Sequence, residues 1–355
     1  MTVGIITWYG VTNYGSALQA YAMQQLVTQL GRDSTILRHR VHENSHANQR
    51  RRASLRSLYP GTRAAQRGEL QKQRAVSDFR DEYLNVSSAY LEDCAVDLAL
   101  IGSDQVFDIR GFQPFQFGLD VNATKVTAYA PSFGETTYDD LRDSPHRNKV
   151  ELGLRRMAKL SVRDENSRAI VKEVTGDDPP VVLDPTLLYD FSDEKTQWTT
   201  PAIERRYALI YTWWGVTTTK EFASAVQTFS RAHNLQTVSV GDTRPWCDVN
   251  FHGASPSEYV SLISRATVVI TNMFHGSCFA LANNVPILPL VMPHNEHKLG
   301  GLLTQFGLTN HRVDDVMALG TADIPTIDFN QLAQRLASER HSSRQFLEAA
   351  LTQAE

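Results

Sequence analysis

The stretch VVITNMFHGSCFALANNVPILPLVMPHNEHK runs from Val268 to Lys298 and contains a complete structural unit. It begins with an apolar run, Val268 to Ile270, that is typical of a strand buried in a parallel sheet. Thr271 and Asn272 end this run, and a glycine follows His275 where a helix is expected to begin. A second apolar run then ends in proline. The order of strand, loop, helix and strand predicts a doubly wound α/β fold.

The same order is found in both halves of the chain. From the N-terminus, an apolar run and a polar loop precede a helical pattern that ends at Gly31. After a polar segment at 190–205 the pattern restarts with a predicted strand over 206–215. We therefore predict an α/β, GT-B-like protein in which two Rossmann-like domains with parallel sheets face a cleft. The predicted parts are an N-terminal domain (1–195), a C-terminal domain (205–335) and a C-terminal helix (336–355).

Composition excludes several classes of protein. Of the 355 residues, 42% are hydrophobic and 21% are charged, which suits a folded soluble protein. A net charge of −4 argues against binding of nucleic acid by the chain as a whole. No apolar stretch approaches the roughly 18 residues that a membrane span needs. Cys94, Cys247 and Cys278 match no metal-binding spacing and, with no leader-like N-terminus, predict a reduced, cytoplasmic setting.

A basic segment, Arg50 to Arg74, contains eight Lys or Arg residues and a single acid, Glu69. Such a run suits a pair of solvated helices over the N-terminal domain. It also suits contact with an anionic acceptor or peripheral contact with a membrane. The protein is therefore expected in the cytoplasm, with the inner face of the membrane as an alternative. The sequence leaves the oligomeric state open.

Polar loops follow the predicted strands, and they should converge because the carboxyl ends of parallel strands share an edge of the sheet. Gly15 and Ser16 open a helix whose free N–H groups suit an anion or the polar edge of a sugar, although an ordinary turn has the same pattern. Asp104 can orient or deprotonate a hydroxyl group, or cap a helix. The residues predicted to contact an acceptor are Asn13, Tyr14, Gly15, Ser16, Gln105 and Ser132.

Three further charged residues suit an anionic ligand or a structural role. Arg163 offers a fixed guanidinium for a carboxylate or phosphate, and a salt bridge with Asp184 is the alternative. Asp184 lies in residues 179–190, which we predict as a strand ending in a loop, and a structural role is favoured for it. Lys298 is expected to bind an anion. We predict no metal site near it, because His294 and its neighbours offer too few ligands.

His275 follows a buried strand and precedes a glycine that opens a helix. This position suits general acid–base chemistry or anion binding. It suits a core histidine held by hydrogen bonds to the same degree.

Six motifs then indicate a family. NYGSALQAYA, IGSDQVF, YAPSFG, LSVRDENS, VVLDPTLL and TNMFHGSCFAL occur in the order seen in the polysaccharide pyruvyl transferase family, which the sequence resembles from about residue 3 to residue 310. The resemblance implies two Rossmann-like domains packed as in GT-B glycosyltransferases. It also implies transfer of a pyruvyl group from phosphoenolpyruvate, held by the C-terminal domain, to two hydroxyl groups of a sugar at the N-terminal domain, which forms a cyclic ketal.

By motif, His275 resembles the histidine proposed in that family as an acid or donor ligand, and Arg163 resembles the arginine that contacts the donor. One branch has Arg-Leu-His where this chain has Met273-Phe274-His275, which is closer to the Ser-Phe-His branch. Lys298 would then supply the missing cation. We predict that His275 is catalytic and that Asp104 steers the acceptor hydroxyl. The predicted donor contacts are Arg163, Asn272, Gly276, Ser277 and Lys298.

The predicted function is therefore pyruvyl transfer to a sugar, or to a lipid-linked or nucleotide-linked glycan, as in exopolysaccharide biosynthesis. Phosphoenolpyruvate is the expected co-substrate, and no cofactor, metal or nucleic acid is expected. Two alternatives are a GT-B glycosyltransferase that uses a nucleotide sugar and a non-catalytic glycan-binding relative. Glu258, on a helix before the strand at Val268, favours the first alternative, and Met273 favours the second.

Overall fold

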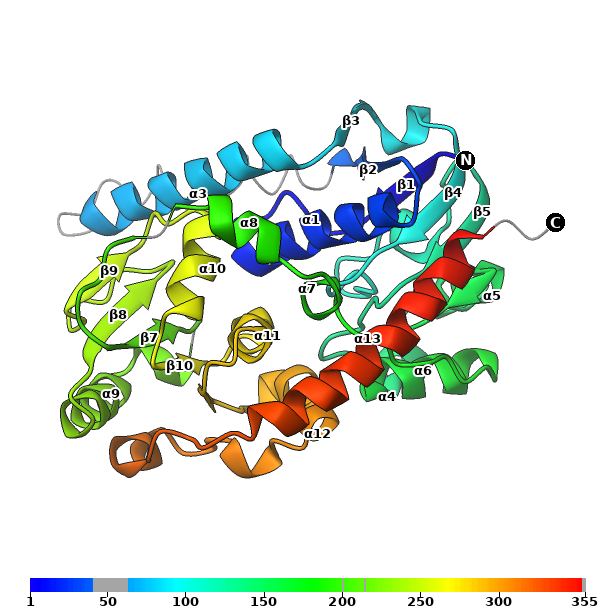
Figure 1. Cartoon of the computed structure of the whole chain (residues 1–355). Coiled ribbons are helices and arrows are strands. Elements are labelled where there is room, and N and C mark those ends of the chain that lie inside the picture. Colours follow the sequence, from blue (N-terminus) through cyan, green and yellow to red (C-terminus); the bar gives the residue numbers. More distant parts are fainter. Residues whose placement is uncertain (41–62, 200, 214, 353–355) are drawn as a thin grey trace.

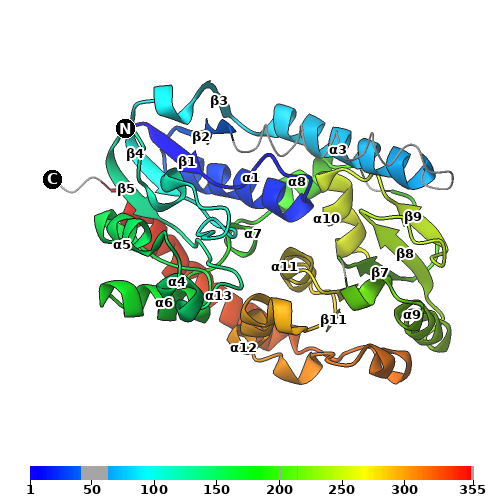
Figure 2. The same cartoon turned by 180° about the vertical axis from the view of Figure 1, so that it is seen from behind.

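The computed structural model describes residues 1–40, 63–199, 201–213 and 215–352, and this part of the chain contains two parallel β-sheets (Figure 1). The N-terminal sheet has the strand order β3-β2-β1-β4-β5-β6, and the C-terminal sheet has the order β11-β10-β7-β8-β9. Helices lie between and around the sheets (Figure 2). The predicted α/β fold with two Rossmann-like domains is confirmed.

The strands of the N-terminal sheet are β1 (Val3–Ile6), β2 (Ser34–Arg38), β3 (Val86–Tyr90), β4 (Val96–Ile101), β5 (Ala123–Ala128) and β6 (Lys159–Leu160). Those of the C-terminal sheet are β7 (Tyr207–Tyr211), β8 (Gln236–Val240), β9 (Val249–Phe251), β10 (Val268–Thr271) and β11 (Ile287–Pro289). The helices are α1 (Tyr14–Gln29), α3 (Arg63–Tyr83), α4 (Tyr138–Arg142), α5 (Arg147–Arg156), α6 (Glu165–Thr175), α7 (Pro185–Leu188), α8 (Ser192–Gln197), α9 (Lys220–Ala232), α10 (Pro256–Ser264), α11 (Phe274–Ala282), α12 (Gly301–Phe306) and α13 (Phe329–Leu351).

The stretch that begins at Val268 forms β10, α11 and β11, as predicted. All of β10 is buried, and it lies between β7 and β11, with Val268 opposite Ala208 and Val269 opposite Ile287. β-Branched residues suit a strand that is covered on both faces, which explains why this run forms a central strand. Its carboxyl end places the following loop at the edge of the sheet.

The two domains share one hydrophobic core. Its buried residues come from one face of each sheet and from helices between the sheets, as Ile36, Leu187, Tyr259 and Val269 illustrate. Two further cores cover the opposite faces, one for each sheet. The shared core therefore fixes the positions of the two sheets relative to each other.

The last helix, α13, ties the C-terminal part of the chain to the N-terminal domain (Figure 1). The backbone N–H of Leu183 donates to Ser343 Oγ at 2.9 Å, and Lys125 Nζ donates to the carbonyl of Thr352 at 3.0 Å. The helix begins at Phe329, before the predicted residue 336.

The basic segment divides into two parts. Residues 50–62 lie outside the described residues, so contact with a membrane through them stays a prediction. The rest belongs to α3, which packs on both α1 and α10. Lys72 Nζ donates to the carbonyl of Gly241 at 3.0 Å, so α3 bridges both domains rather than covering the N-terminal domain alone. Within the described ranges, no helix is long and apolar enough to cross a membrane.

The predicted strand over 179–190 is wrong. Val181 forms a single bridge with Val162, and the chain then enters α7, which Asp184 caps. Pro185 occupies the first helical position, where its missing N–H is tolerated and its fixed φ favours the helix. The sequence pattern also missed β3 and β9, both of which are edge strands.

Candidate active site

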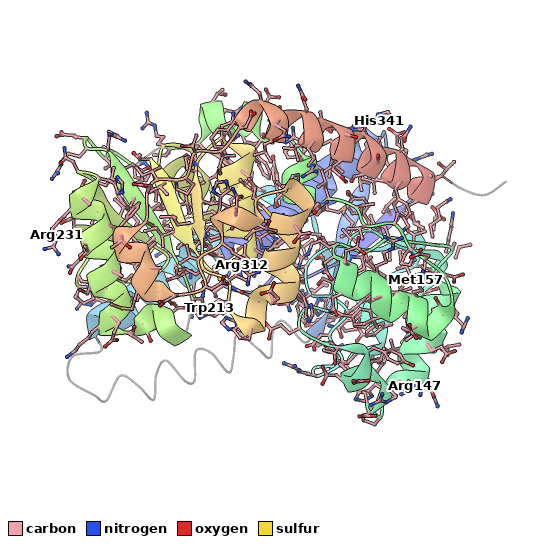
Figure 3. The ribbon with its side chains drawn as sticks, turned by 90° about the horizontal axis from the view of Figure 1, so that it is seen from below. Arg147, Met157, Trp213, Arg231, Arg312 and His341 are labelled. Carbon is pink, nitrogen blue, oxygen red and sulfur yellow. The ribbon has the colours of Figure 1, made fainter. Side chains whose placement is uncertain are left out.

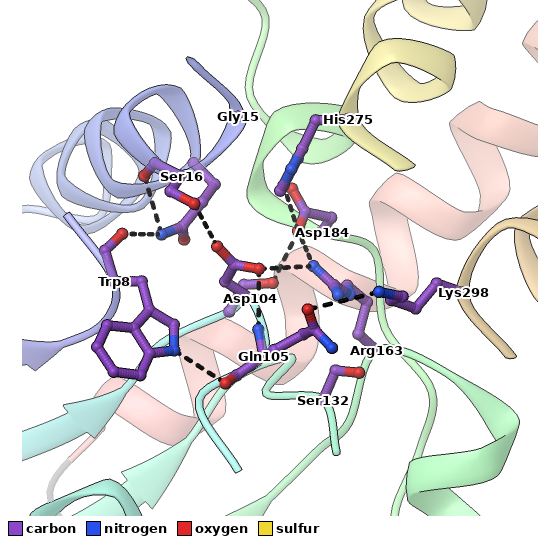
Figure 4. A network of polar contacts seen from close by, with 12 residues as sticks. Trp8, Gly15, Ser16, Asp104, Gln105, Ser132, Arg163, Asp184, His275 and Lys298 are labelled. Atoms are coloured by element: carbon purple, nitrogen blue, oxygen red, sulfur yellow. Dashed lines mark hydrogen bonds and ion pairs between the residues drawn. The ribbon is translucent and has the colours of Figure 1, made fainter. Parts of the chain in front are cut away.

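Loops from both domains meet in a polar network at the carboxyl ends of the strands (Figure 4). The N-terminal domain contributes Asp104 after β4, Arg163 after β6, and Asp184 at the start of α7. The C-terminal domain contributes His275, in the first turn of α11. The network is largely enclosed, since the exposed side-chain fractions are 3% for Arg163, 0% for Asp184 and 9% for His275.

Asp184 lies at the centre of the network. Its Oδ1 accepts hydrogen bonds from the backbone N–H (3.0 Å) and hydroxyl (2.7 Å) of Thr186, which anchors α7. Its Oδ2 accepts from Ser103 Oγ at 2.8 Å and from Arg163 Nη1 at 3.1 Å, and it lies 3.5 Å from His275 Nε2. Burial would raise the pKa of Asp184, but His275 and Arg163 hold this pKa well below its usual range. Asp184 is therefore a carboxylate and does not act as an acid near neutral pH.

Arg163 is fixed by two carboxylates and an aromatic ring. Its Nη1 lies 3.1 Å from Asp184 Oδ2 and 3.9 Å from Asp104 Oδ1. Its guanidinium carbon lies 4.2 Å from the centre of the Phe274 ring. Burial would lower the pKa of Arg163, but Asp184 and Asp104 raise it above the ordinary value, so the side chain is charged. Among the described residues, its Nε has no hydrogen-bond partner.

Asp104 has a left-handed backbone, with a φ of 77°. Few residues with a side chain adopt this conformation, and such strain often occurs where it positions a functional group. The conformation aims Asp104 Oδ2 at Ser16 Oγ, which donates to it at 2.6 Å. Ala130, in the neighbouring loop after β5, is left-handed too, with a φ of 57°. Two strained loops therefore border the site on its N-terminal side.

His275 packs against the start of α1. A Cβ atom on Gly15 would collide with Nδ1 and Cγ of the imidazole, so only glycine lets the α1 backbone approach the ring this closely. The other ring nitrogen, Nε2, is buried and forms no hydrogen bond within the described part of the chain. The contact of 3.5 Å with Asp184 is therefore electrostatic, and Nε2 is a buried polar atom whose hydrogen-bonding capacity is unused among the described residues.

The first turn of α11 also has unpaired donors. Its N-cap residue, Met273, makes no side-chain capping bond, so no side chain satisfies the first backbone N–H groups from that position. Ser277 Oγ is buried and has no partner among the described residues. Buried polar groups normally have partners, and the positive end of a helix suits an anion. Arg163 Nε, His275 Nε2 and Ser277 Oγ are thus three buried polar atoms without partners among the described residues, and groups of this kind are the ones that a polar or anionic ligand satisfies.

Lys298 extends from the C-terminal domain to two loops of the N-terminal domain. It lies in a π-helical turn, Glu296–Gly300, and its Nζ is 3.4 Å from both Gln105 Oε1 and Glu135 Oε1. The structure therefore brings the predicted cation to the site and pairs it with a carboxylate.

Several of the predicted acceptor contacts have structural partners. Asn13 Oδ1 accepts from the backbone N–H of Gly15 at 2.8 Å and so caps α1. Ser132 Oγ donates to Asp164 Oδ2 at 2.6 Å and is fully buried. Tyr14 is also fully buried and stacks on Tyr259. This burial gives Tyr14 a role in packing and removes it from the acceptor contacts that we propose.

Two of the predicted donor contacts shape the loop before α11. Asn272 exchanges two hydrogen bonds with the backbone of Trp213, at 2.8 and 2.7 Å. A Cβ atom on Gly276 would come within 2.6 Å of Thr271 Oγ1, so this glycine is required by packing. Both residues therefore hold the loop that carries His275.

The site residues predicted from the sequence leave out three members of the network, namely Ser103, Glu135 and Phe274. For Asp184 the sequence favoured a structural role, with a salt bridge to Arg163 as one interpretation, and the structure contains this salt bridge at 3.1 Å. Ser103 and Phe274 directly adjoin candidates that were chosen, and this adjacency was the available signal. Asp184 follows the run Val181 to Leu183, at the end of a predicted strand. A salt bridge with Arg163 accounted for this residue, so it was not predicted to belong to the site. In the described ranges, no cluster of His, Cys, Asp and Glu side chains is suited to a metal ion.

The arrangement combines a fixed cation, an imidazole, a carboxylate tied to a hydroxyl and unpaired donors at a helix start. It can hold an acidic substrate and move protons beside it. The charged groups come from both domains, so a reaction between two substrates is possible only while the domains lie together.

Known proteins resemble this chain in sequence and fold. Residues 13–292 match the family described as polysaccharide pyruvyl transferase. UGT89C1 from Arabidopsis thaliana, complexed with UDP-L-rhamnose, has a TM-score of 0.52 and 12% identity, covering 98% of each chain. UDP-GlcNAc 2-epimerase from Methanocaldococcus jannaschii has a TM-score of 0.49 and 11% identity, covering 92% of this chain and 94% of that one. No relative was found among curated proteins.

The likeness to the plant protein confirms the GT-B-like fold. The family match includes Asp104, Arg163, Asp184 and His275, so it spans the whole central network but not Lys298. Because the match covers most of the sequence, the chain belongs to the polysaccharide pyruvyl transferase family.

Proposed function

We propose that the protein transfers a pyruvyl group from phosphoenolpyruvate to two hydroxyl groups of a sugar or glycan, forming a cyclic ketal and releasing phosphate. The observation that carries this proposal is the set of unpaired buried polar atoms around the start of α11 and Arg163. Phosphoenolpyruvate has a phosphate and a carboxylate, which require such donors. Membership of the pyruvyl transferase family supports the same reaction.

In this proposal the donor lies against the first turn of α11. Its phosphate accepts from backbone N–H groups, including that of Gly276, and from Ser277 Oγ. Its carboxylate accepts from Arg163 Nε. Lys298 leaves Glu135 and turns to the phosphate, replacing the cation that Met273 does not provide. Phe274 keeps the guanidinium in place by stacking on it.

The proposed chemistry uses one acid and one base. His275 protonates C3 of the enol, an acceptor hydroxyl attacks C2, and Asp104 takes the proton of that hydroxyl. The bond from C2 to the phosphate oxygen then breaks, and the second hydroxyl closes the ketal while its proton leaves with the phosphate. Asp184 positions Arg163 and His275 without exchanging a proton, as its low pKa requires.

The acceptor that we propose is a sugar or glycan in free, lipid-linked or nucleotide-linked form. Ser16, Asp104 and Gln105 are the N-terminal side chains that would meet it. The proposal needs no cofactor beyond phosphoenolpyruvate as co-substrate and places the reaction in the cytoplasm.

Thermal melting tests the donor. Phosphoenolpyruvate should raise the melting temperature, and Arg163→Lys should lose most of this rise because an ammonium group does not reproduce the guanidinium fork. Arg168→Gln alters a partly exposed arginine on α6 and serves as the matched control, which should keep the rise. A rise with nucleoside diphosphates or nucleotide sugars, and none with phosphoenolpyruvate, would contradict the proposal and favour a glycosyltransferase.

Product analysis tests the acceptor. The protein is incubated with phosphoenolpyruvate and a panel of sugars, nucleotide sugars and lipid-linked glycans. Release of phosphate together with an acceptor that has gained a pyruvyl ketal supports the proposal. Phosphate release without a modified acceptor indicates hydrolysis and contradicts it.

A further inference from the structure

A cavity of about 380 Å³ lies at the junction of α7, α13 and the end of α1. Its lining includes Gln29 at the end of α1, Asp190 after α7, and Arg340 and Arg344 on α13. None of the residues of the polar network lines it. Its volume lies within the range of roughly 300–1,000 Å³ that small-molecule sites usually have.

The two arginines of this cavity have neutral partners. Arg340 Nε donates to the carbonyl of Leu187 at 2.7 Å, and Arg344 Nη2 donates to Gln29 Oε1 at 3.3 Å. Within the described part of the chain, neither guanidinium forms an ion pair. Burial lowers the pKa of Arg340, and Asp190 offsets this effect only in part. The cavity therefore contains two cations that an anion would neutralise.

The lining of the cavity also contains groups beside the arginines that accept hydrogen bonds. Asp190 Oδ1 is occupied by Ser192, whose N–H and hydroxyl donate to it at 3.1 and 2.5 Å. The negative charge of Asp190 repels a bare anion, but the carboxylate oxygens can accept further hydrogen bonds from hydroxyl groups. Gln29 offers a further amide. His341, which follows Arg340 on α13 (Figure 3), is also part of the lining.

We propose that this cavity binds a phosphorylated sugar, with the phosphate on Arg340 and Arg344 and the sugar hydroxyl groups on Asp190 and Gln29. The cation pair suits the phosphate, and the hydrogen-bonding groups beside it suit the hydroxyl groups of the sugar. The site is separate from the proposed donor and acceptor sites, and its test needs no turnover.

The location of the cavity connects it to the network. Leu188, the last residue of α7, lines the cavity, whereas Asp184 caps the first turn of the same helix. Arg340 holds α7 through the carbonyl of Leu187. A bound ligand would therefore contact the short helix that fixes Asp184.

Calorimetry with glucose 6-phosphate tests the site directly. Arg344→Gln should weaken binding at least about tenfold, because it removes a charge-assisted hydrogen bond. Ala337→Glu adds a carboxylate and bulk at an exposed position that lines the cavity, and it should abolish binding. Ala333→Glu makes the same change one turn earlier, at an exposed position outside the lining, and should bind as the wild type does. Both positions are helical and exposed, so folding is preserved.

Two other ligands define the chemistry. Inorganic phosphate should bind more weakly than glucose 6-phosphate, because it uses only the arginine side. Vesicles that contain phosphatidylinositol present a phosphate and hydroxyl groups on a lipid headgroup. If the protein sediments with these vesicles, and Arg344→Gln abolishes this, the natural ligand is a lipid. Binding of glucose 6-phosphate in solution assigns a free metabolite.

Three results would overturn the proposal. The first is unchanged affinity in both Arg344→Gln and Ala337→Glu. The second is loss of binding in Arg163→Lys, which would place the sugar phosphate in the polar network instead. The third is equal affinity for inorganic phosphate and glucose 6-phosphate, which would remove the sugar from the site.

Discussion

The surroundings of Asp184 and Arg163 fix the charge of both side chains. His275 and Arg163 keep Asp184 ionised in spite of its burial, and the carboxylates keep Arg163 charged. Neither group exchanges protons under ordinary conditions. An imidazole is the side chain that commonly does so near neutral pH, and His275 Nε2 has no hydrogen-bond partner within the described residues. At the residue scale, this is why our proposal gives proton donation to His275 and gives Asp104 the role of accepting the hydroxyl proton.

Replacing His275 with alanine should lower the rate of ketal formation by about 10²–10⁴-fold, because the variant lacks the proposed acid. The melting shift with phosphoenolpyruvate should persist in part, since the donors of α11 and Arg163 are unchanged. Single-turnover kinetics measure the rate, and melting measures the binding. Unchanged turnover would remove His275 from the chemistry.

The ion pair between Lys298 and Glu135 competes with the donor in our proposal. Glu135→Gln frees the ammonium group, so phosphoenolpyruvate should bind several-fold more tightly, and the gain should shrink at high salt. Calorimetry at two ionic strengths measures this. Glu151→Gln, which breaks a pair with Arg155 on α5, is the control and should leave the affinity unaltered. Weaker binding in Glu135→Gln would show that Glu135 supports the donor site.

At the scale of elements, the approach of α1 to α11 depends on one missing side chain. Gly15→Ala should displace the imidazole of His275 or push α1 away from it. We expect a lower melting temperature and reduced turnover, measured on the same preparation. Gly301→Ala is the control, because a Cβ atom there meets no neighbour and the backbone is right-handed. Similar behaviour of the two variants would contradict this close contact.

The short helix α7 links stability to pH through Asp184. The pKa of this group is lower in the folded protein than its ordinary value of about 3.9, so its stabilising contribution is present above that pH and is lost as the pH falls below it. Asp184→Asn leaves Arg163 without its main partner and should cost about 3–5 kcal/mol of the free energy of unfolding at pH 7. Urea unfolding between pH 7 and pH 3 measures this, and the difference from wild type should shrink in acid. A constant difference over that range would refute the assignment.

The sequence predicted those elements whose signals are local. The β-branched run before Asn272 indicated β10, and the loops after strands indicated Asp104, Arg163 and His275. The prediction of a strand around Asp184 was wrong because the apolar run before it resembles a strand. Asp184 caps a helix instead, and the fixed φ of Pro185 favours the first turn of that helix. The central position of Asp184 depends on partners such as Ser103, 81 residues away, and no local pattern reports such a contact.

At the scale of the whole molecule, three structural features join the domains. The shared core fills the space between the sheets, α3 crosses from one domain to the other, and α13 returns to the N-terminal domain. Large apolar contacts of this kind oppose the relative motion that separate domains otherwise show. The joining of the domains is also what assembles the network, because His275 comes from one side and Arg163 from the other.

This shared core restricts how a substrate reaches a largely enclosed site. Hinge opening would expose part of the shared core, at roughly 25 cal/mol for each Å² of apolar surface. Displacement of the partly exposed side chains of Lys298 and Glu135 exposes none of this core. The radius of gyration from small-angle X-ray scattering should therefore stay the same when phosphoenolpyruvate is added. A decrease would reveal hinge closure. With an unchanged radius, association depends on rearrangement of these side chains. Lys298→Ala should then speed association, because it removes the pair with Glu135, and should also speed dissociation, because it removes the cation proposed for the phosphate.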